Sequence, residues 1–132
     1  MLISIDQNDP RPIYQQIAAA IKQQLCSGLL EPGDELPSVR DMADALAVNL
    51  HTVRHAYKLL REQGVVRLGL ARRAKILAPP KQPPNQKQLE QTLLPRLREL
   101  VADAGRLGVG DDDLRQLMDH AIIATRKRRS KK

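Results

Sequence analysis

The residues best suited to bind another molecule lie between positions 49 and 63, where polar and basic side chains alternate with apolar ones. The apolar members recur every three or four residues, which predicts an amphipathic helix over 50–63 with one buried stripe. That stripe is Leu50, Val53, Ala56, Tyr57 and Leu60. The outer face carries His51, Thr52, Arg54, His55, Lys58 and Arg61. Side chains of these types donate hydrogen bonds, and several are positively charged, so this face is suited to a polyanion.

Two other interpretations of this face remain open from the sequence. Surface helices ordinarily carry charged outer faces, so Arg54, Lys58 and Arg61 could simply be solvated. His51 and His55, spaced i and i+4, could both ligate zinc, but no cysteine or acidic third ligand is apparent nearby, so we predict no metal site. The sequence also contains no Ser/His/Asp or Cys/His set in a recognisable setting, so we expect neither an enzyme nor a cofactor.

Two helices are predicted ahead of this one. Apolar residues at three- and four-residue steps predict the first over residues 12–25. Ser38 is a good N-cap for the second, and Asp41, three residues later, completes a capping-box pattern. This second helix is short and ends near Leu46. Arg40 lies in its first turn, where a helix N-terminus also attracts phosphate.

A hairpin is predicted after residues 50–63. Asn49 is a good N-cap for that helix, and the β-prone runs 65–68 and 75–77 follow it. The loop between the runs carries Arg72 and Arg73, so it is basic. A short helix, a three-residue turn, a longer basic helix and a basic hairpin follow one another in a winged helix-turn-helix. We therefore predict a mainly α fold with a small β-hairpin wing (α+β).

The predicted order of elements favours double-stranded DNA as the partner. A helix fits the major groove, where His51, Thr52 and Arg54 could reach base edges together with His55. The hairpin arginines, Arg72 and Arg73, could hold a neighbouring phosphate or enter the minor groove. The ordered elements make the solvated-face interpretation less favourable than it would be for one basic helix alone.

The second half of the chain predicts a linker and a pairing module. Four prolines within residues 79–84 favour a stiff extended spacer. Pro95 lies inside the apolar pattern that follows, so we expect a kink or a late helix start there. Asp111 is expected to cap a last helix. The apolar residues of the two helices are Leu93, Leu97, Leu100, Ala104, Leu107, Leu114, Leu117, Met118, Ala121 and Ile122. About 40 residues cannot bury both stripes alone, so we expect them to form a dimer interface with a second copy.

Composition narrows the class of protein. The 132 residues carry a net charge of +7 and include two Tyr, no Phe and no Trp, which disfavours an aromatic platform for single strands. The single cysteine, Cys26, excludes an intramolecular disulfide framework.

No apolar run approaches the roughly 18 residues of a membrane-spanning helix, and the start is unlike a signal peptide, so we expect a soluble, cytoplasmic protein without a membrane partner. The last heptad, 126–132, holds six basic residues.

Four spaced blocks resemble the GntR family of bacterial regulators. They read Pro12-Ile13-Tyr14-Gln15-Gln16-Ile17, Gly28-x-Leu30-x-Pro32-Gly33-Asp34-x-Leu36-Pro37-Ser38-x-Arg40, Thr52-Val53-Arg54-x-Ala56-Tyr57 and Gly64-Val65-Val66. The resemblance covers about residues 10–77. The short tail is similar to the YtrA-like branch, in which two C-terminal helices form a dimerisation module, and lacks the large aminotransferase-like domain of the MocR-like branch. Such proteins are usually repressors.

The resemblance also implies particular DNA contacts. Carried over by position, they fall on Arg40, Asn49, Leu50, His51, Thr52 and Arg54. Leu50 would touch a thymine methyl or the core. Two departures stand out: Ala47 replaces the usual glycine of the turn, and residues 71–76 lack both glycines and the aromatic residue of the usual wing. We therefore predict contact between the wing and phosphate through the charges of Arg72 and Arg73.

We expect four parts in the chain. They are a winged helix-turn-helix DNA-binding domain over 1–78, a proline-rich linker over 79–85, a two-helix dimerisation module over 86–126 and a basic disordered tail over 127–132. The leading hypothesis is a homodimeric repressor that binds a near-palindromic operator. The alternatives are an architectural nucleic-acid protein without sequence preference, and a protein-interaction adaptor that works through its C-terminal helices. The sequence leaves room for an unidentified small-molecule effector at the dimer interface or beside the DNA-binding domain.

Overall fold

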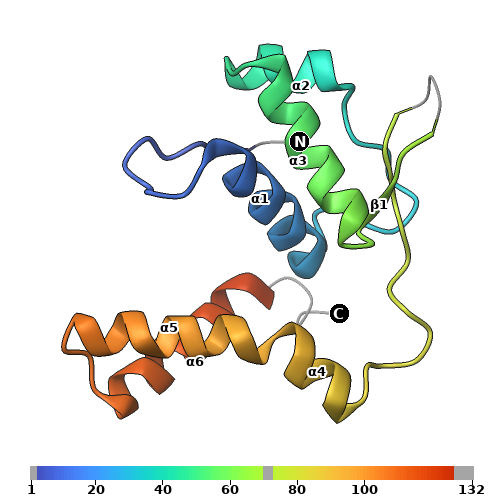
Figure 1. The fold of residues 1–132 in the computed structure, drawn as a ribbon. Helices are drawn as coiled ribbons and strands as arrows, with labels where there is room; N and C mark the ends of the chain where they lie inside the picture. Colours follow the sequence, from blue (N-terminus) through green and yellow to red (C-terminus); the bar gives the residue numbers. More distant parts are fainter. Residues whose placement is uncertain (1–2, 70–72, 127–132) are drawn as a thin grey trace. The chain divides into compact units, whose positions relative to one another are not determined.

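The computed structural model describes residues 3–69 and 73–126 (Figure 1). Its elements are α1 (Ile13–Ser27), α2 (Val39–Leu46), α3 (Leu50–Glu62), β1 (Val66–Arg67), β2 (Lys75–Ile76), α4 (Gln86–Thr92), α5 (Leu94–Arg106) and α6 (Asp111–Arg126). The chain divides between Pro79 and Pro80 into two compact units. The arginine at position 72 and the tail 127–132, for which we predicted phosphate contact and disorder, lie outside the described residues.

The first unit is a winged helix-turn-helix, as predicted. Both α1 and α2 pack against α3 (Figure 1). The buried stripe of α3 lies at the centre of the core. The largest fully buried side chains are Ile17, Ile21, Leu36, Leu60, Ile76, Val53 and Val66. The two strands are antiparallel, with Val66 opposite Ile76 and Arg67 opposite Lys75. They are shorter than the runs predicted from composition.

Side-chain caps fix where α2 and α3 begin. The Ser38 hydroxyl accepts a hydrogen bond of 3.0 Å from the backbone N–H of Asp41. The Asn49 Oδ1 accepts one of 2.7 Å from the backbone N–H of His51. Both contacts satisfy backbone donors that have no partner within their own helix. The two N-caps predicted from sequence are therefore confirmed.

The turn between α2 and α3 contains a strained residue. Ala47 has φ 56° and ψ 45°, which is the left-handed region that side chains with a Cβ avoid. Its backbone N–H still bonds to the carbonyls of Ala43 and Asp44, so hydrogen bonding holds the turn in this conformation. The family's usual glycine at this position would adopt it without steric cost.

Ala47→Gly is therefore expected to stabilise the first unit by about 1 kcal/mol, because it removes the steric cost of the left-handed conformation. Thermal unfolding measures the effect. The matched control is Ala45→Gly, an exposed position inside α2, where glycine should destabilise by about 1 kcal/mol. A loss of stability in the Ala47 variant equal to that in the control would contradict this account.

The second unit contains a helix that was not predicted. A capping box begins α4: the Asn85 Oδ1 accepts from the Gln88 N–H, and the Gln88 side chain accepts from the Asn85 N–H, each at 2.9 Å. Leu89 is the one large apolar residue of α4, so the sequence shows no apolar stripe that would predict this helix. Pro95 lies at the start of α5, which confirms the late helix start. Asp111 is the first residue of α6 and not the residue before it, so it adds charge to the first turn together with its two acidic neighbours.

Candidate nucleic-acid interface

The outer face of α3 is polar and open to solvent along its length. His51, Arg54, His55 and Lys58 are exposed. Thr52 and Leu50 are half-buried, and Leu50 packs against the core. A leucine held in this way can offer only part of its surface to a thymine methyl. The face thus presents donors and positive charge, while the opposite face of the same helix is buried.

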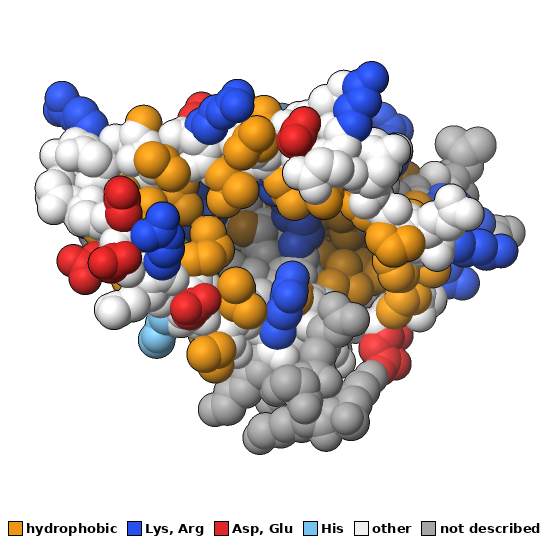
Figure 2. Space-filling view, turned by 90° about the horizontal axis from the view of Figure 1, so that it is seen from below, with side chains coloured by type: hydrophobic (Ala, Val, Ile, Leu, Met, Phe, Trp, Pro, Cys, Tyr) orange, Lys and Arg blue, Asp and Glu red, His pale blue; other side chains and the backbone are white. Residues whose placement is uncertain are grey.

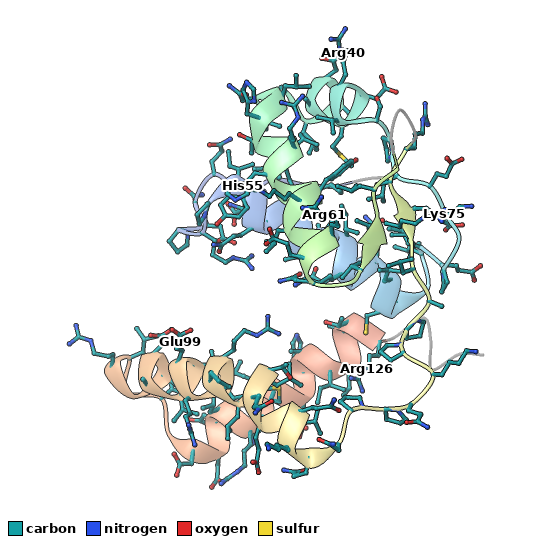
Figure 3. All side chains as sticks on the ribbon, turned by 45° about the vertical axis from the view of Figure 1, so that its right-hand side comes forward. Arg40, His55, Arg61, Lys75, Glu99 and Arg126 are labelled. Carbon is teal, nitrogen blue, oxygen red and sulfur yellow. The ribbon has the colours of Figure 1, made fainter. Side chains whose placement is uncertain are left out.

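Asn49 serves first as a helix cap. Its Oδ1 is already engaged by the His51 N–H, so its Nδ2 group is the part of the side chain that could donate to a base or phosphate. Arg40 is exposed in the first turn of α2, and Figure 3 shows it projecting outward from that helix. The α2 and α3 N-termini therefore bring Arg40 and Asn49 to the surface of the same unit.

The hydroxyl of Tyr57 holds the segment that precedes α2. Tyr57 is 3% exposed, and its hydroxyl donates a hydrogen bond of 2.7 Å to the carbonyl of Pro37. Burial raises the pKa of Tyr57 well above its usual range, so the hydroxyl keeps its proton and remains a donor. This contact ties the segment just before Ser38 and Arg40 to the middle of α3.

Tyr57→Phe is expected to destabilise the first unit by about 1–3 kcal/mol, because the half-buried Pro37 carbonyl would lose its donor. Urea unfolding checks this. Tyr14→Phe is the matched control, since the Tyr14 hydroxyl only accepts a bond from the exposed Gln15 amide. Equal effects from the two variants would show that the Pro37 contact contributes nothing of its own.

An ion pair links the described part of the wing to α2. A guanidinium nitrogen of Arg73 lies 3.6 Å from a carboxylate oxygen of Asp41, and both side chains are more than half exposed. An exposed pair of this kind contributes little to stability and exchanges readily for another anion. Lys75, on β2, is also exposed, and Figure 3 places it on the strand side of the unit.

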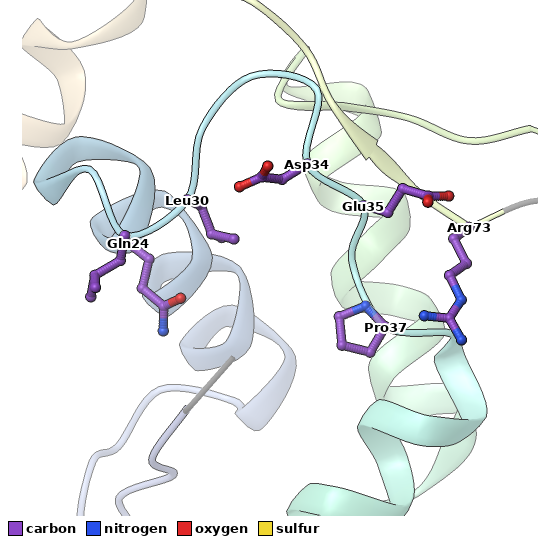
Figure 4. Close-up of a pocket in the computed structure, with 7 residues that line it drawn as sticks. Gln24, Leu30, Asp34, Glu35, Pro37 and Arg73 are labelled. Carbon is purple, nitrogen blue, oxygen red and sulfur yellow. The ribbon is translucent and has the colours of Figure 1, made fainter.

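A cavity of about 570 Å³ lies beside the base of the wing (Figure 4). Its lining residues are Gln24, Leu29, Leu30, Asp34, Glu35, Pro37 and Arg73. One carboxylate oxygen of Asp34 is already engaged within the turn, because it accepts a hydrogen bond of 2.9 Å from the backbone N–H of Glu31. The lining mixes two carboxylates with one guanidinium and matches no single ligand chemistry.

The two histidines of α3 have different surroundings. The His55 ring stacks on Tyr14 of α1, with ring centroids 3.7 Å apart and planes 12° apart. The His51 Nδ1 lies 3.1 Å from an Nη atom of Arg54. Sequence reasoning missed both contacts, although the i, i+3 spacing of His51 and Arg54 could have indicated the second. Among the residues that the structure describes, no three His, Cys, Asp or Glu side chains gather as a metal site requires.

The second unit leaves most of its apolar side chains open. Its exposed large apolar residues are Leu93, Leu97, Leu100, Val101, Leu107, Leu117, Ile122 and Ile123. Ala104 is buried and Leu114 and Met118 are half-buried, while Ala121 is exposed. Figure 2 shows apolar side chains lying open at the surface among charged ones. Exposure of this extent is typical of a surface that is covered by a partner.

Two of these apolar residues were not predicted. Val101 is 56% and Ile123 is 68% exposed. Each directly follows a residue of the predicted stripe, so a wider stripe on each helix would have included them. Within the described ranges, no helix is long and apolar enough to span a membrane.

The comparisons with known proteins agree with this architecture. The family model described as bacterial regulatory proteins, gntR family, matches residues 13–72. The HTH-type transcriptional repressor YtrA of Bacillus subtilis is 42% identical over 65 residues, which are 49% of this chain and 50% of that protein. The chain thus covers half of that relative, and it covers 11% and 13% of two other curated relatives, which are much longer.

Solved structures match over more of the chain. A transcriptional antiterminator from Listeria monocytogenes has a TM-score of 0.84 and 28% identity, with 96% of this chain and 93% of that one covered. YtrA from Sulfolobus acidocaldarius, a GntR-family transcription factor, has a TM-score of 0.59 and 32% identity, with 75% of this chain and 99% of that one covered. The matched family model, the identity to this second protein and its nearly complete coverage show that the chain belongs to the GntR family of regulatory proteins.

Proposed function

We propose that the protein is a sequence-specific, DNA-binding transcriptional repressor that binds a near-palindromic operator as a homodimer. The observation that carries the DNA-binding part is the outer face of α3, where Arg54, His51 and Lys58 are exposed on a helix whose other face is firmly buried. A rigid helix with this polarity suits the major groove. The similarity to the B. subtilis repressor YtrA supports the regulatory role.

The second unit supports the homodimeric part of the proposal. Two copies that cover one another's apolar α5 and α6 residues would remove these side chains from water, which is favourable by roughly 25 cal/mol per Å² of apolar surface. A two-fold axis would then relate two copies of α3, and the operator would mirror that symmetry as an inverted repeat. The mass of the protein in solution tests this part directly: a mass of two chains is expected, and a monomer at micromolar concentration would refute it.

Phosphate contacts are expected to supply much of the affinity, through Arg40, Lys58, Arg72 and Arg73. Each neutralised phosphate releases counterions, so the affinity should fall by roughly 10³–10⁵-fold between 50 and 200 mM salt if a dimer makes 6–10 such contacts. Titration of a labelled operator at several salt concentrations measures the slope. Binding that does not change with salt would argue against a phosphate-dominated interface.

Substitution of Arg73, on the wing, tests the phosphate contacts at a single residue. Arg73→Ala should weaken binding to operator and to random duplex by the same factor and should lower the salt slope by about one for each protomer. Asp41→Asn, which removes the partner of Arg73 in the free protein, should leave the slope unchanged or raise it. If Arg73→Ala left both affinity and slope unaltered, the wing would not contact phosphate through this residue.

The proposal includes no specified effector. An effector that changes the spacing of the two α3 helices would act through the dimer interface or beside the DNA-binding unit. An experiment would identify such an effector as a small molecule that changes the affinity for the operator while the protein keeps the same number of chains.

A further inference from the structure

The exposed face of α3 contains one hydrogen bond between two of its own side chains. An Nη atom of Arg54 lies 3.1 Å from the Nδ1 atom of His51. A guanidinium has only donors, so the imidazole nitrogen must be the acceptor. This hydrogen bond therefore requires the tautomer of the imidazole that carries its proton on Nε2.

The backbone of His51, whose ring is the acceptor, is held by the N-cap of α3. The His51 backbone N–H donates to the Asn49 Oδ1 at 2.7 Å, so the cap holds the first turn of α3 around His51. The spacing of His51 and Arg54 is i, i+3, which places the two side chains next to each other on one helix face. Arginine side chains have about 2 kcal/mol of rotamer entropy when free. An acceptor beside the guanidinium restricts that freedom before any partner arrives.

The bond leaves most of the guanidinium available. One N–H of Arg54 is used by His51, and four of its five N–H groups remain. Guanine presents two acceptors, O6 and N7, at its major-groove edge, and their geometry suits a bidentate arginine. Histidine at position 51 also leaves an Nε2–H donor beside the guanidinium, so the pair presents donors only and suits a base edge rich in acceptors.

We propose that His51 is a positioning residue, which holds the Arg54 guanidinium in the orientation that recognises a guanine, so that discrimination at one base pair of each half-site depends on both residues. This inference rests on the proposed DNA-binding function. It assigns to His51 a role through Arg54 instead of an independent base contact. The other histidine of α3 differs, because the face of the His55 ring is covered by Tyr14.

The test uses the full chain and an operator selected from randomised duplexes by the unaltered protein. Affinities are measured for this operator and for versions with each base pair of the half-site replaced. Arg54→Ala should abolish discrimination at one pair, a change of roughly 5- to 150-fold. His51→Ala should reduce discrimination at that same pair by roughly 3- to 10-fold, in proportion to one hydrogen bond. The double variant, Arg54→Ala with His51→Ala, should show no further loss of discrimination at that pair beyond the loss in Arg54→Ala.

Two further variants separate positioning from structure. His51→Asn keeps an acceptor oxygen near the place of Nδ1, so it should restore much of the discrimination that His51→Ala loses. His120→Ala removes an exposed imidazole from α6 and should change nothing at this base pair. Thermal unfolding of every variant shows whether the first unit remains folded.

The outcomes separate this inference from the proposed function. If the unaltered protein selects an operator but His51→Ala keeps full discrimination, or loses it at a different base pair from Arg54→Ala, the positioning role is wrong and the DNA-binding function stands. If the losses at the shared pair add in the double variant, His51 acts independently of Arg54, and the inference is also overturned. A protein that binds no duplex at all would overturn the proposed function and this inference together.

Discussion

Arg54→Ala is expected to weaken binding to the operator by roughly 5- to 150-fold for each half-site, because it removes from each protomer a bidentate contact to a base edge worth about 1–3 kcal/mol. The side chain is exposed in the first half of α3 and is already held by His51 at 3.1 Å. Its removal should leave the fold intact, since it has no role in the core. Fluorescence anisotropy with operator and with random duplex measures both affinity and specificity.

The matched control for this variant is Arg61→Ala. It removes the same charge from the last turn of α3, and Arg61 is also exposed (Figure 3). This control should lower affinity for operator and random duplex alike, because it changes only the charge of the helix. If Arg54→Ala behaved as Arg61→Ala does, with equal effects on the two duplexes, Arg54 would be a general phosphate contact and not a base reader.

The second large effect is expected from the apolar residues of α5. Leu97→Glu combined with Leu100→Glu should convert a dimer to a monomer, because each change places a charge where the interface must exclude water. Both leucines are about two-fifths exposed in the single chain, so the change should not unfold the second unit. Operator affinity should fall by roughly 10²–10⁴-fold, because the second half-site would no longer benefit from the high effective concentration that dimerisation gives.

Analytical ultracentrifugation and operator titration together check the second prediction. The control is Gln91→Glu combined with Gln116→Glu, which adds the same two charges at exposed polar positions of α4 and α6. It should remain dimeric. A Leu97/Leu100 variant that stayed dimeric would show that α5 does not form the interface, and one that became monomeric with unchanged operator affinity would show that binding does not require two chains.

Much of the first unit could be predicted because its signals are local. Ser38 and Asn49 mark helix starts by side-chain chemistry within three residues, and both caps were found. The buried stripe of α3 follows from its spacing alone. The left-handed conformation of Ala47 was indicated by the position that the family usually fills with glycine.

The features that sequence reasoning missed depend on contacts between distant segments or on weak local patterns. The Tyr14–His55 stack and the Asp41–Arg73 pair join residues that are 41 and 32 positions apart. No periodicity carries such information, since it arises only when the helices pack. The α4 helix was missed for a different reason, because a capping box and a single leucine define it and no apolar stripe does.

The role of each candidate contact residue stays a prediction, and the structure narrows how some of them could act. Asn49 has its oxygen engaged in a cap, Leu50 is packed on the core, and the face of the His55 ring is stacked. Arg54 remains the exposed side chain on α3 whose donors best suit a base edge. The specificity of the protein is therefore expected to depend chiefly on Arg54 and on the residue that orients it.

The most direct measurement is selection of bound duplexes from a fully randomised pool, followed by sequencing and by the mass of the selected complex. The account predicts one enriched inverted repeat, with half-sites about 10–10.5 base pairs apart centre to centre, or a multiple of that spacing, bound by two chains. An unenriched pool that is nevertheless bound would contradict sequence-specific recognition and favour an architectural role. An enriched site bound by one chain would contradict the homodimer.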